Sequence, residues 1–376
     1  KSPQDVDFTK TVTTVTDATT LRQTIDTNKV INDRLQLRFN GMLQDGEVAG
    51  RDEITDDRRG AALALKFAAT DALTLEGNLS YTKIEQTPDW GVPYVNNEDL
   101  GLVGPVTEYG IDRDTFYGVP GRDFQTVEET VATAKATYAF DNGMTLTNTF
   151  RAARSTNDYV LTAPSSLIDN DSTNPEDWEV GLSFKSWNQQ TDVLANVLEL
   201  SGAAQFASAS HSYVLGLATS REEIEKLSYS NLSSEDYEPP AGQRGCTVSA
   251  VNPDPIGEGC WSGEEPVLGT DLTETTVKTT SLYALDTVTL SNRLKVNGGL
   301  RVDMYDISRS GGTGEDAYEL SRDDVMLDLR KIKSAAEIDL MERAADINDV
   351  VLKEAAKLVK VGMTEIQVAG LAENIA

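Results

Sequence analysis

The sequence predicts a mostly β protein, in which about eleven long antiparallel strands form part of a transmembrane β-barrel and a C-terminal α-helical hairpin follows. Three observations predict this fold class. Apolar and polar side chains alternate over segments of roughly ten residues, whereas an average soluble strand has about five or six. Short turns alternate with long polar links along the chain. Near residue 327 the apolar spacing changes from a period of two to a helical period.

The segment at residues 130–155 shows the alternation most clearly. Its two arms flank Asn142-Gly143, a pair that supplies the positive φ angles of a tight hairpin turn. In a membrane barrel the apolar face would meet lipid and the polar face would line the lumen. The apolar set is Ala136, Tyr138, Phe140 and Leu146, and the polar set is Lys135 and Arg151.

The same alternation predicts strands throughout the first three hundred or so residues. They lie at residues 6–15, 20–29, 34–44, 60–69, 73–84, 128–140, 144–155, 187–199, 209–219, 275–288 and 293–305. In the fifth, for example, Leu75 and Leu79 alternate with Glu76 and Ser80. Alternation is equally expected in a soluble sandwich with one wet face, so it does not decide between the two architectures.

The connections between these strands favour the barrel. Short links lie at residues 30–33, 70–72, 141–143, 201–208 and 291–293, and long links at residues 45–59, 85–126, 156–186 and 220–274. The link at residues 17–20 is the one short loop on the long side. Compact soluble domains rarely hold several such long loops. A membrane barrel has short periplasmic turns and long extracellular loops.

Composition excludes several classes of function. The 61 acidic and 33 basic residues give a formal charge of −28, which argues against nucleic acid because few cations can displace phosphate counterions. No apolar run approaches the length of a transmembrane helix. One histidine and two cysteines argue against a zinc or iron site. His211, the single histidine, alternates with Tyr213 and Leu215 on an apolar face, which favours a structural role. The sequence therefore predicts no catalytic residue, no metal site and no cofactor bound by the chain.

Two features of the long links are candidates for a role. Cys246 and Cys260 bracket a tip rich in Gly, Pro and Asp, and a disulfide there would contribute about 2–4 kcal/mol. It would require an oxidising compartment; the alternative is a pair of free thiols. Aromatic residues also stand beside arginines in these links, where they could stack on and pair with a planar anionic ligand. The candidate ligand-binding residues are Arg51, Trp90, Tyr94, Phe116, Tyr117 and Arg122, with Arg113 as a further cation.

The alternative for these residues is structural. The aromatic side chains could pack the loops against their neighbours, and each arginine could form a salt bridge with one of the many nearby acids.

The C-terminal part has another character. Residues 309–326 are predicted to form a linker, and residues 327–376 a helical hairpin. Ser334 and Glu337 form a capping box that begins one helix, and Thr364 and Gln367 form a second. Gly362 between them suits the end of the first helix.

Several stretches resemble the barrel of TonB-dependent siderophore receptors of Gram-negative bacteria, and the resemblance covers about residues 1–310. They are residues 1–3, 38–42, 50–53, 88–94, 116–118, 121–124 and 297–303, for example Pro-Asp-Trp-Gly-Val-Pro-Tyr and Asn-Gly-Gly-Leu-Arg-Val-Asp. The resemblance implies an outer-membrane protein that takes up ferric siderophores. Its expected partners are the siderophore, outer-membrane lipid and the TonB complex; nucleic acid and enzymatic activity are not expected.

The resemblance also implies a partial barrel. The family's barrel has roughly 22 strands and follows an N-terminal plug with a TonB box, whereas residues 1–308 hold about half that number of strands and neither plug nor TonB box is expected. The outer strands, at residues 6–15 and 294–304, would then have unpaired edges, and each unpaired backbone group costs several kcal/mol in lipid. We therefore expect a curved, open sheet.

Residues 325–376 resemble the start of the catalytic domain of the creatinase/Xaa-Pro aminopeptidase family, through Leu-Arg-Lys-Ile-Lys-Ser at 329–334 and Val-Gly-Met-Thr-Glu at 361–365. That family's metal ligands lie further downstream, so no metal site is implied here. Two alternatives to the receptor function therefore stand. One is a truncated metallopeptidase of this kind fused to a β domain, and the other is a soluble β-rich surface-binding protein.

Overall fold

A computed structural model describes residues 1–320, apart from residues 17–18, 52, 169–171, 207–208, 234–245, 292–293 and 312–318. The predicted C-terminal hairpin lies outside the described residues, as does most of the predicted linker. What is described is built from antiparallel strands with two short 3-10 helices. No helix in this part of the chain is long and apolar enough to cross a membrane.

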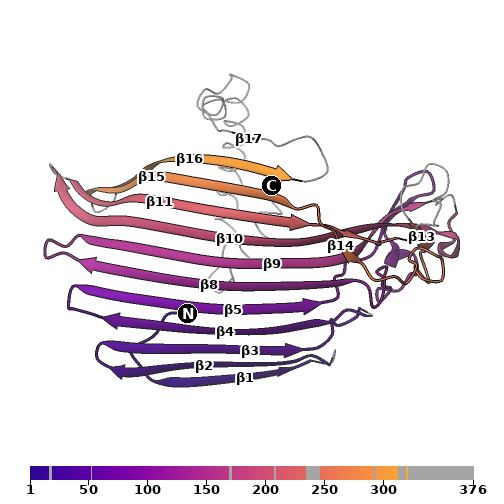
Figure 1. Ribbon diagram of the computed structural model, residues 1–376, viewed down its shortest axis with the longest axis horizontal. Coiled ribbons are helices and arrows are strands. Elements are labelled where there is room, and N and C mark those ends of the chain that lie inside the picture. Colours follow the sequence, from indigo (N-terminus) through magenta and orange to yellow (C-terminus); the bar gives the residue numbers. More distant parts are fainter. Residues whose placement is uncertain are drawn as a thin grey trace. The chain divides into compact units, whose positions relative to one another are not determined.

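Long strands follow one another in chain order across a single antiparallel sheet (Figure 1). They are β1 Phe8–Val15, β2 Leu21–Asn32, β3 Leu35–Asp45, β4 Asp56–Ala68, β5 Leu73–Gln86, β8 Phe124–Ala139, β9 Thr145–Ile168, β10 Glu179–Phe206, β11 Ala209–Leu227, β15 Thr273–Ser291 and β16 Leu294–Gly311. Short β17, Glu319–Leu320, pairs with β16. All the strands expected from the alternation are therefore present, in the expected order.

The predicted long link at residues 156–186 is wrong. Strand β9 continues to Ile168 and pairs there with Glu179, the first residue of β10. The extensions lack a clear alternation because neighbouring residues such as Val160 and Leu161 are both buried, as happens when a strand is covered on both faces. Similarly, β11 extends to Leu227, and β10 runs through most of the predicted link at residues 201–208.

The Asn142-Gly143 turn is present, but with one positive φ angle instead of two. Gly143 has φ 82° and donates its backbone N–H to the carbonyl of Phe140, at 3.0 Å. The Asn142 side chain instead accepts from the N–H of Met144, at 3.1 Å. An Asn side chain that holds its own turn in this way explains why asparagine suits the position without a left-handed backbone.

The two faces of the sheet differ as predicted. On the apolar face, one row of residues crosses five neighbouring strands, each residue directly opposite the next: Leu63, Leu79, Ala132, Ala152 and Leu194. The three leucines of this row are more than half exposed. On the polar face, Lys135 forms an ion pair with Glu76 at 3.1 Å. Tyr138 and Leu146 lie opposite each other on the apolar face.

Two polar side chains on the apolar face, Asn148 and Asn196, form hydrogen bonds with each other. Asn148 donates to the side-chain oxygen of Asn196 at 2.9 Å, and Asn196 donates back to that of Asn148 at 3.2 Å. Both amides also contact backbone carbonyls of the neighbouring strand. Reciprocal bonding of this kind removes most of the cost of placing an amide where water is scarce.

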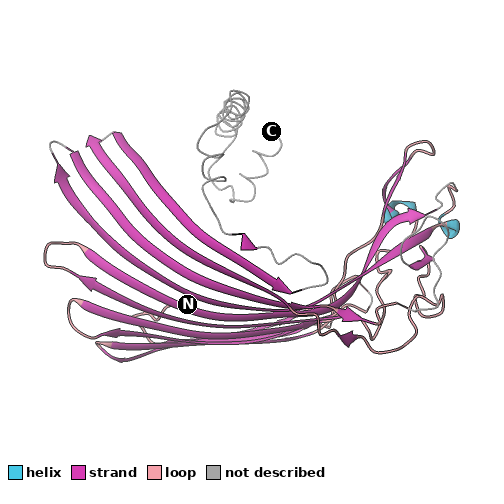
Figure 2. Cartoon of the chain, turned by 45° about the horizontal axis from the view of Figure 1, so that its top comes forward, coloured by secondary structure: helices cyan, strands magenta, loops and turns pink. Residues whose placement is uncertain are grey.

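The sheet is open in the described residues. Its path begins at β1 and ends at β17, and no pairing joins these ends; Figure 2 shows the sheet bent into a trough. The N-terminal segment is tied to the polar face, where Arg38 donates to the carbonyl of Ser2 and, through two nitrogens, to Asp26. Asn28 donates to the carbonyls of Gln4 and Val6.

Shorter elements gather at the end of the sheet where the long links lie (Figure 2). They are β6 Tyr94–Asn97, β7 Leu102–Pro105, η1 Val106–Tyr109, η2 Pro175–Asp177, β12 Tyr229–Ser230, β13 Cys246–Ser249 and β14 Val267–Leu268. Strands β6 and β7 form a hairpin, β12 pairs with β14, and β13 pairs with the start of β10. We call residues 87–123 and 246–268, with the adjoining ends of β9 and β10, the loop domain.

A charged side chain placed on the apolar face tests whether that face contacts lipid. Leu200 lies between Leu146 and Leu215 on that face, and its neighbour Ser201 lies on the polar face. Leu200→Arg is expected to destabilise the membrane-inserted protein by about 2–4 kcal/mol, since a charge is placed against lipid. Urea unfolding in lipid vesicles measures this. Ser201→Arg is the matched control, and an equal loss in both variants would contradict the assignment of faces.

Candidate functional site

The loop domain has a hydrophobic core of its own. Its members are Val95, Leu102, Val106, Ile111, Tyr117, Trp178, Val180, Leu182, Cys246, Val248, Ala250 and Cys260. Trp178 packs edge-on against Tyr109 at a centroid distance of 5.6 Å, and its indole N–H donates to the carbonyl of Ser172 at 2.8 Å. A core built from several separate links fixes those links relative to the rigid strands.

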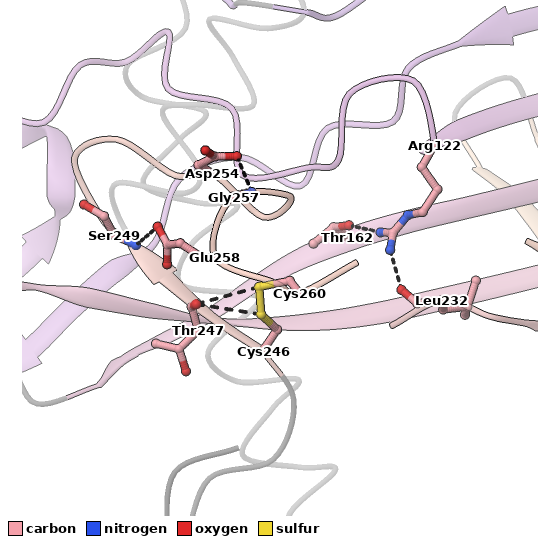
Figure 3. Close-up of a disulfide and its surroundings, with 10 residues drawn as sticks. All are labelled: Arg122, Thr162, Leu232, Cys246, Thr247, Ser249, Asp254, Gly257, Glu258 and Cys260. Carbon is pink, nitrogen blue, oxygen red and sulfur yellow. Dashed lines mark hydrogen bonds between the residues drawn. A yellow bond between two sulfur atoms is a disulfide. The ribbon is translucent and has the colours of Figure 1, made fainter. Parts of the chain in front are cut away.

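A disulfide joins Cys246 to Cys260 within this core (Figure 3), as the sequence predicts. The two Cα atoms lie 5.4 Å apart, and both residues are buried. Pairing of β13 with β10 positions Cys246 opposite Leu182. Closing a loop of this length stabilises a fold by about 3 kcal/mol through restriction of the unfolded chain.

Polar contacts shape the segment enclosed by the disulfide (Figure 3). The Asp254 carboxylate accepts from the N–H of Gly257 at 2.8 Å, and that of Glu258 accepts from the N–H of Ser249 at 3.2 Å. The tip therefore has a defined conformation rather than only a covalent tether.

Arg122 is fully buried in the loop domain. Its guanidinium donates to Asp123 at 2.8 and 3.0 Å. Two further bonds run to the hydroxyl of Thr162, at 2.5 Å, and to the carbonyl of Leu232 (Figure 3). The guanidinium also lies 4.5 Å from the centroid of the Phe184 ring. These contacts use the donors of the side chain, so Arg122 joins several links and does not point into open space.

Tyr117 is also buried, and its hydroxyl donates to the carbonyl of Ala250 at 2.6 Å. Burial raises the pKa of the Tyr117 hydroxyl to about 12, opposed in small part by the charge of Arg51. Because this folded-state pKa lies above the unfolded value, the stabilisation is complete below about pH 10. It decreases as the pH rises from there through the folded-state value.

Arg51 connects two long links. Its guanidinium forms a two-pronged ion pair with Asp89, at 2.7 Å for both bonds, and donates to the carbonyl of Arg113. Only 8% of the side chain is exposed. A bidentate pair of this kind orients the guanidinium and offsets its charge.

Beside Arg51 lies a cavity of about 850 Å³. It is lined by Glu47, Arg51, Glu53, Thr55, Asp112, Asp114, Thr115, Phe116, Gly118, Pro120, Val251, Asn252, Pro253 and Asp254. Five carboxylates therefore face one guanidinium, which is already paired with Asp89. The local potential opposes anions and favours cationic or hydrogen-bond-donating groups.

The structure separates the candidate ligand-binding residues into three groups. Arg51 and Phe116 line the cavity together. Trp90 and Tyr94 are 60% and 57% exposed on the surface of the loop domain. Tyr117 and Arg122 are buried in its core, where a ligand reaches them only if the core opens.

Sequence reasoning missed the acidic lining of the cavity. Glu47, Asp112 and Asp254 come from three different links, and no sequence signal distinguished them from the many other acids of the long loops. Within the described ranges, no three His, Cys, Asp or Glu side chains are grouped so that they could hold a metal ion.

Removal of the Arg122 charge tests its structural role. Arg122→Gln leaves the buried Asp123 carboxylate without its guanidinium, so the loop domain is expected to lose about 3–5 kcal/mol. Limited proteolysis of the membrane-embedded protein should then cut the loop domain much faster. Arg113→Gln is the control, because Arg113 is exposed and, among the residues that the structure describes, is bonded through its carbonyl. Equal protease resistance in both variants would contradict the role assigned to Arg122.

Comparison with known proteins identifies relatives of the chain. A family model described as "TonB dependent receptor-like, beta-barrel" matches residues 62–326. The chain is 27% identical over 325 residues to the probable TonB-dependent receptor BfrD of Bordetella pertussis, an alignment that covers 82% of this chain and 41% of that protein. It is 26% identical over 309 residues to the catecholate siderophore receptor Fiu of Escherichia coli O157:H7, with coverage of 79% and 39%.

Solved structures show the same fold. The siderophore receptor PiuA of Acinetobacter baumannii superimposes with a TM-score of 0.71 at 23% identity, over 84% of this chain and 45% of that one. The open form of the ferric-catecholate import receptor Fiu of E. coli K12 gives a TM-score of 0.70 at 21% identity, over 86% and 49%. The chain thus spans about two fifths of the length of the curated relatives it matches.

Proposed function

Since the chain belongs to the family of TonB-dependent receptors, we propose that it supplies barrel wall and extracellular loops to a receptor for ferric siderophores. The family consists of outer-membrane transport receptors and not of enzymes. In this proposal the ferric siderophore is the transported cargo and no cofactor is held by the chain. In the same proposal the TonB complex supplies the energy for uptake.

The observation that carries the proposal is the position of the cavity. It lies between the loop domain and the link that joins β3 to β4, at the end of the sheet opposite the short turns, and brings together Arg51 and Phe116 from separate links. Exposed Trp90 and Tyr94 belong to the same domain. Concave sites held by a rigid scaffold, with aromatic and a few polar groups, are where small ligands bind.

The cargo we propose is a ferric catecholate complex. The name of one relative, the catecholate siderophore receptor Fiu, supports this class. Catechol rings are planar and can stack on the rings of Trp90, Tyr94 and Phe116. The acidic lining disfavours an anionic complex, so ring stacking, and not charge pairing, would provide most of the attraction in this proposal.

In this proposal Arg51 contacts the ligand only when its ion pair with Asp89 opens. It can pair with an anionic complex only by giving up Asp89, which costs the bidentate ion pair that it already makes. Tyr117 and Arg122 hold the loop domain together in this proposal and do not contact the ligand in the conformation described.

The resemblance of residues 325–376 to the start of a creatinase/Xaa-Pro aminopeptidase domain remains a separate proposal. The match to the receptor family ends at residue 326, close to the predicted end of the linker. A soluble surface-binding protein is the less favoured function, because many large apolar side chains of the sheet are exposed on one face.

Loss of the exposed aromatic rings tests the proposed function. Trp90→Ala/Tyr94→Ala is expected to weaken binding of a ferric catecholate at least about tenfold, because stacked aromatic pairs are worth about 0.5–1.5 kcal/mol each beyond the area they bury. Equilibrium binding to outer membranes of cells producing the receptor measures it. Val103→Ala, at a similarly exposed aliphatic side chain of the same domain, should bind normally. Unchanged binding in the double variant would contradict the assigned site, and no binding of ferric catecholates by the unaltered receptor would contradict the function.

A further inference from the structure

Every nitrogen of the Arg51 guanidinium already has a hydrogen-bond partner. Nε and one terminal nitrogen donate to the two carboxylate oxygens of Asp89, both at 2.7 Å, and the other terminal nitrogen donates to the backbone carbonyl of Arg113. Two parallel N–H···O bonds are the arrangement through which a guanidinium recognises an anion. Asp89 therefore fills the anion-recognition position of Arg51 with a carboxylate of the chain itself.

This ion pair lies at the wall of the cavity and is shielded from water. Arg51 lines the cavity, whereas Asp89 is not among the described residues around it. The two side chains are only 8% and 21% exposed, and an ion pair withdrawn from water is held more strongly than an exposed one. Because its bonds run to a carboxylate outside the cavity, the guanidinium adds little net positive charge to the cavity.

The other charges around the cavity are negative. Arg51 is the single cation among its described lining residues, which include the carboxylates of Glu47, Glu53, Asp112, Asp114 and Asp254. An anionic group that enters the cavity can therefore gain charge-assisted bonds only from Arg51. The state of the Arg51–Asp89 pair then sets how strongly the cavity discriminates between anionic and neutral ligands.

Asp89 has one further contact, which shapes the turn that carries Trp90. Its Oδ1 accepts from the backbone N–H of Gly91 at 2.8 Å, and Gly91 has a φ of 77°. This bond is local, so it does not depend on Arg51. A carboxylate that leaves Arg51 can keep its turn, and the exposed Trp90 ring moves with it.

We propose that Asp89 is an internal competitor of anionic ligands, and that an acidic group on an aromatic ligand binds Arg51 by displacing it. The exchange replaces one carboxylate by another on the same guanidinium, while the ring of the ligand packs against Phe116. A neutral aromatic ligand enters without opening the ion pair. Asp89 is thus a specificity-determining residue that lowers the affinity for anions. The inference rests on the proposed function, because it concerns the same cavity.

Binding of two small probes to outer membranes of cells producing the receptor tests the competition. Protocatechuate is a catechol with a carboxylate that is ionised at neutral pH, and catechol is its uncharged counterpart. Saturation-transfer NMR measures both affinities. Asp89→Asn should bind protocatechuate at least about tenfold more tightly than the unaltered receptor, because the charge-assisted bonds of Arg51 become available. Its affinity for catechol should be unchanged, and the asparagine oxygen can still accept from Gly91.

Two further variants separate competition from a general change in the charge of the cavity. Asp114→Asn also removes one negative charge from the wall, but Arg51 is bonded to Asp89 and not to Asp114. Its affinity for protocatechuate should rise about twofold at most at physiological salt. Arg51→Gln/Asp89→Asn should lose the tenfold gain, and Arg51→Gln completes the double-mutant cycle that measures the coupling.

Three results would overturn the proposal. The first is an equal gain in Asp89→Asn and Asp114→Asn, and the second is a gain that persists without Arg51. The third is unchanged, weaker or undetectable binding of protocatechuate by Asp89→Asn, since Asp89 would then orient Arg51 instead of competing with the ligand. The probes carry no iron, so a tenfold gain in a receptor that binds no ferric catecholate would count against the proposed function alone.

Discussion

Antiparallel pairing in register is the interaction on which the rest of this structure depends. A strand that crosses lipid must satisfy its backbone N–H and C=O groups on neighbouring strands, because hydrocarbon offers no other partner. Strands β9 and β10 pair over most of their length, from Ser201 opposite Thr145 to Glu179 opposite Ile168, with one register shift near Val180. Since successive side chains point to opposite faces, a slip of one residue would exchange the faces. The apolar face and the polar ion pairs therefore follow from the register.

The loop domain depends on the same strands. Where β9 and β10 extend beyond the apolar face, they acquire cover on both sides, and the core around Trp178 forms against them. The disulfide and the buried Arg122 then tie distant links to this platform. A cavity held in this way keeps its shape without a regular element of its own, which suits recognition of a ligand by loops.

The sequence allowed the strands, their order and the disulfide to be predicted, because alternation and cysteine spacing are local signals. The ends of β9 and β10 near the loop domain could not be predicted. Val160 and Leu161 are adjacent and both buried, so apolar and polar residues do not alternate there. Arginine and tyrosine are used both in binding sites and in polar cores, so nothing local showed that Arg122 and Tyr117 lie inside. The acidic lining arises when three links meet, and only the folded chain brings Glu47, Asp112 and Asp254 together.

The central claim is that even-numbered residues of β10 between 194 and 201 face lipid and odd-numbered ones face the polar side. Nitroxide labels placed singly at each of these positions, with relaxation by dissolved oxygen measured in lipid vesicles, test it most directly. The account predicts a period of two, with maxima at residues such as Leu194, Leu198 and Leu200. Uniform accessibility along the strand, or maxima at the odd-numbered positions, would contradict it.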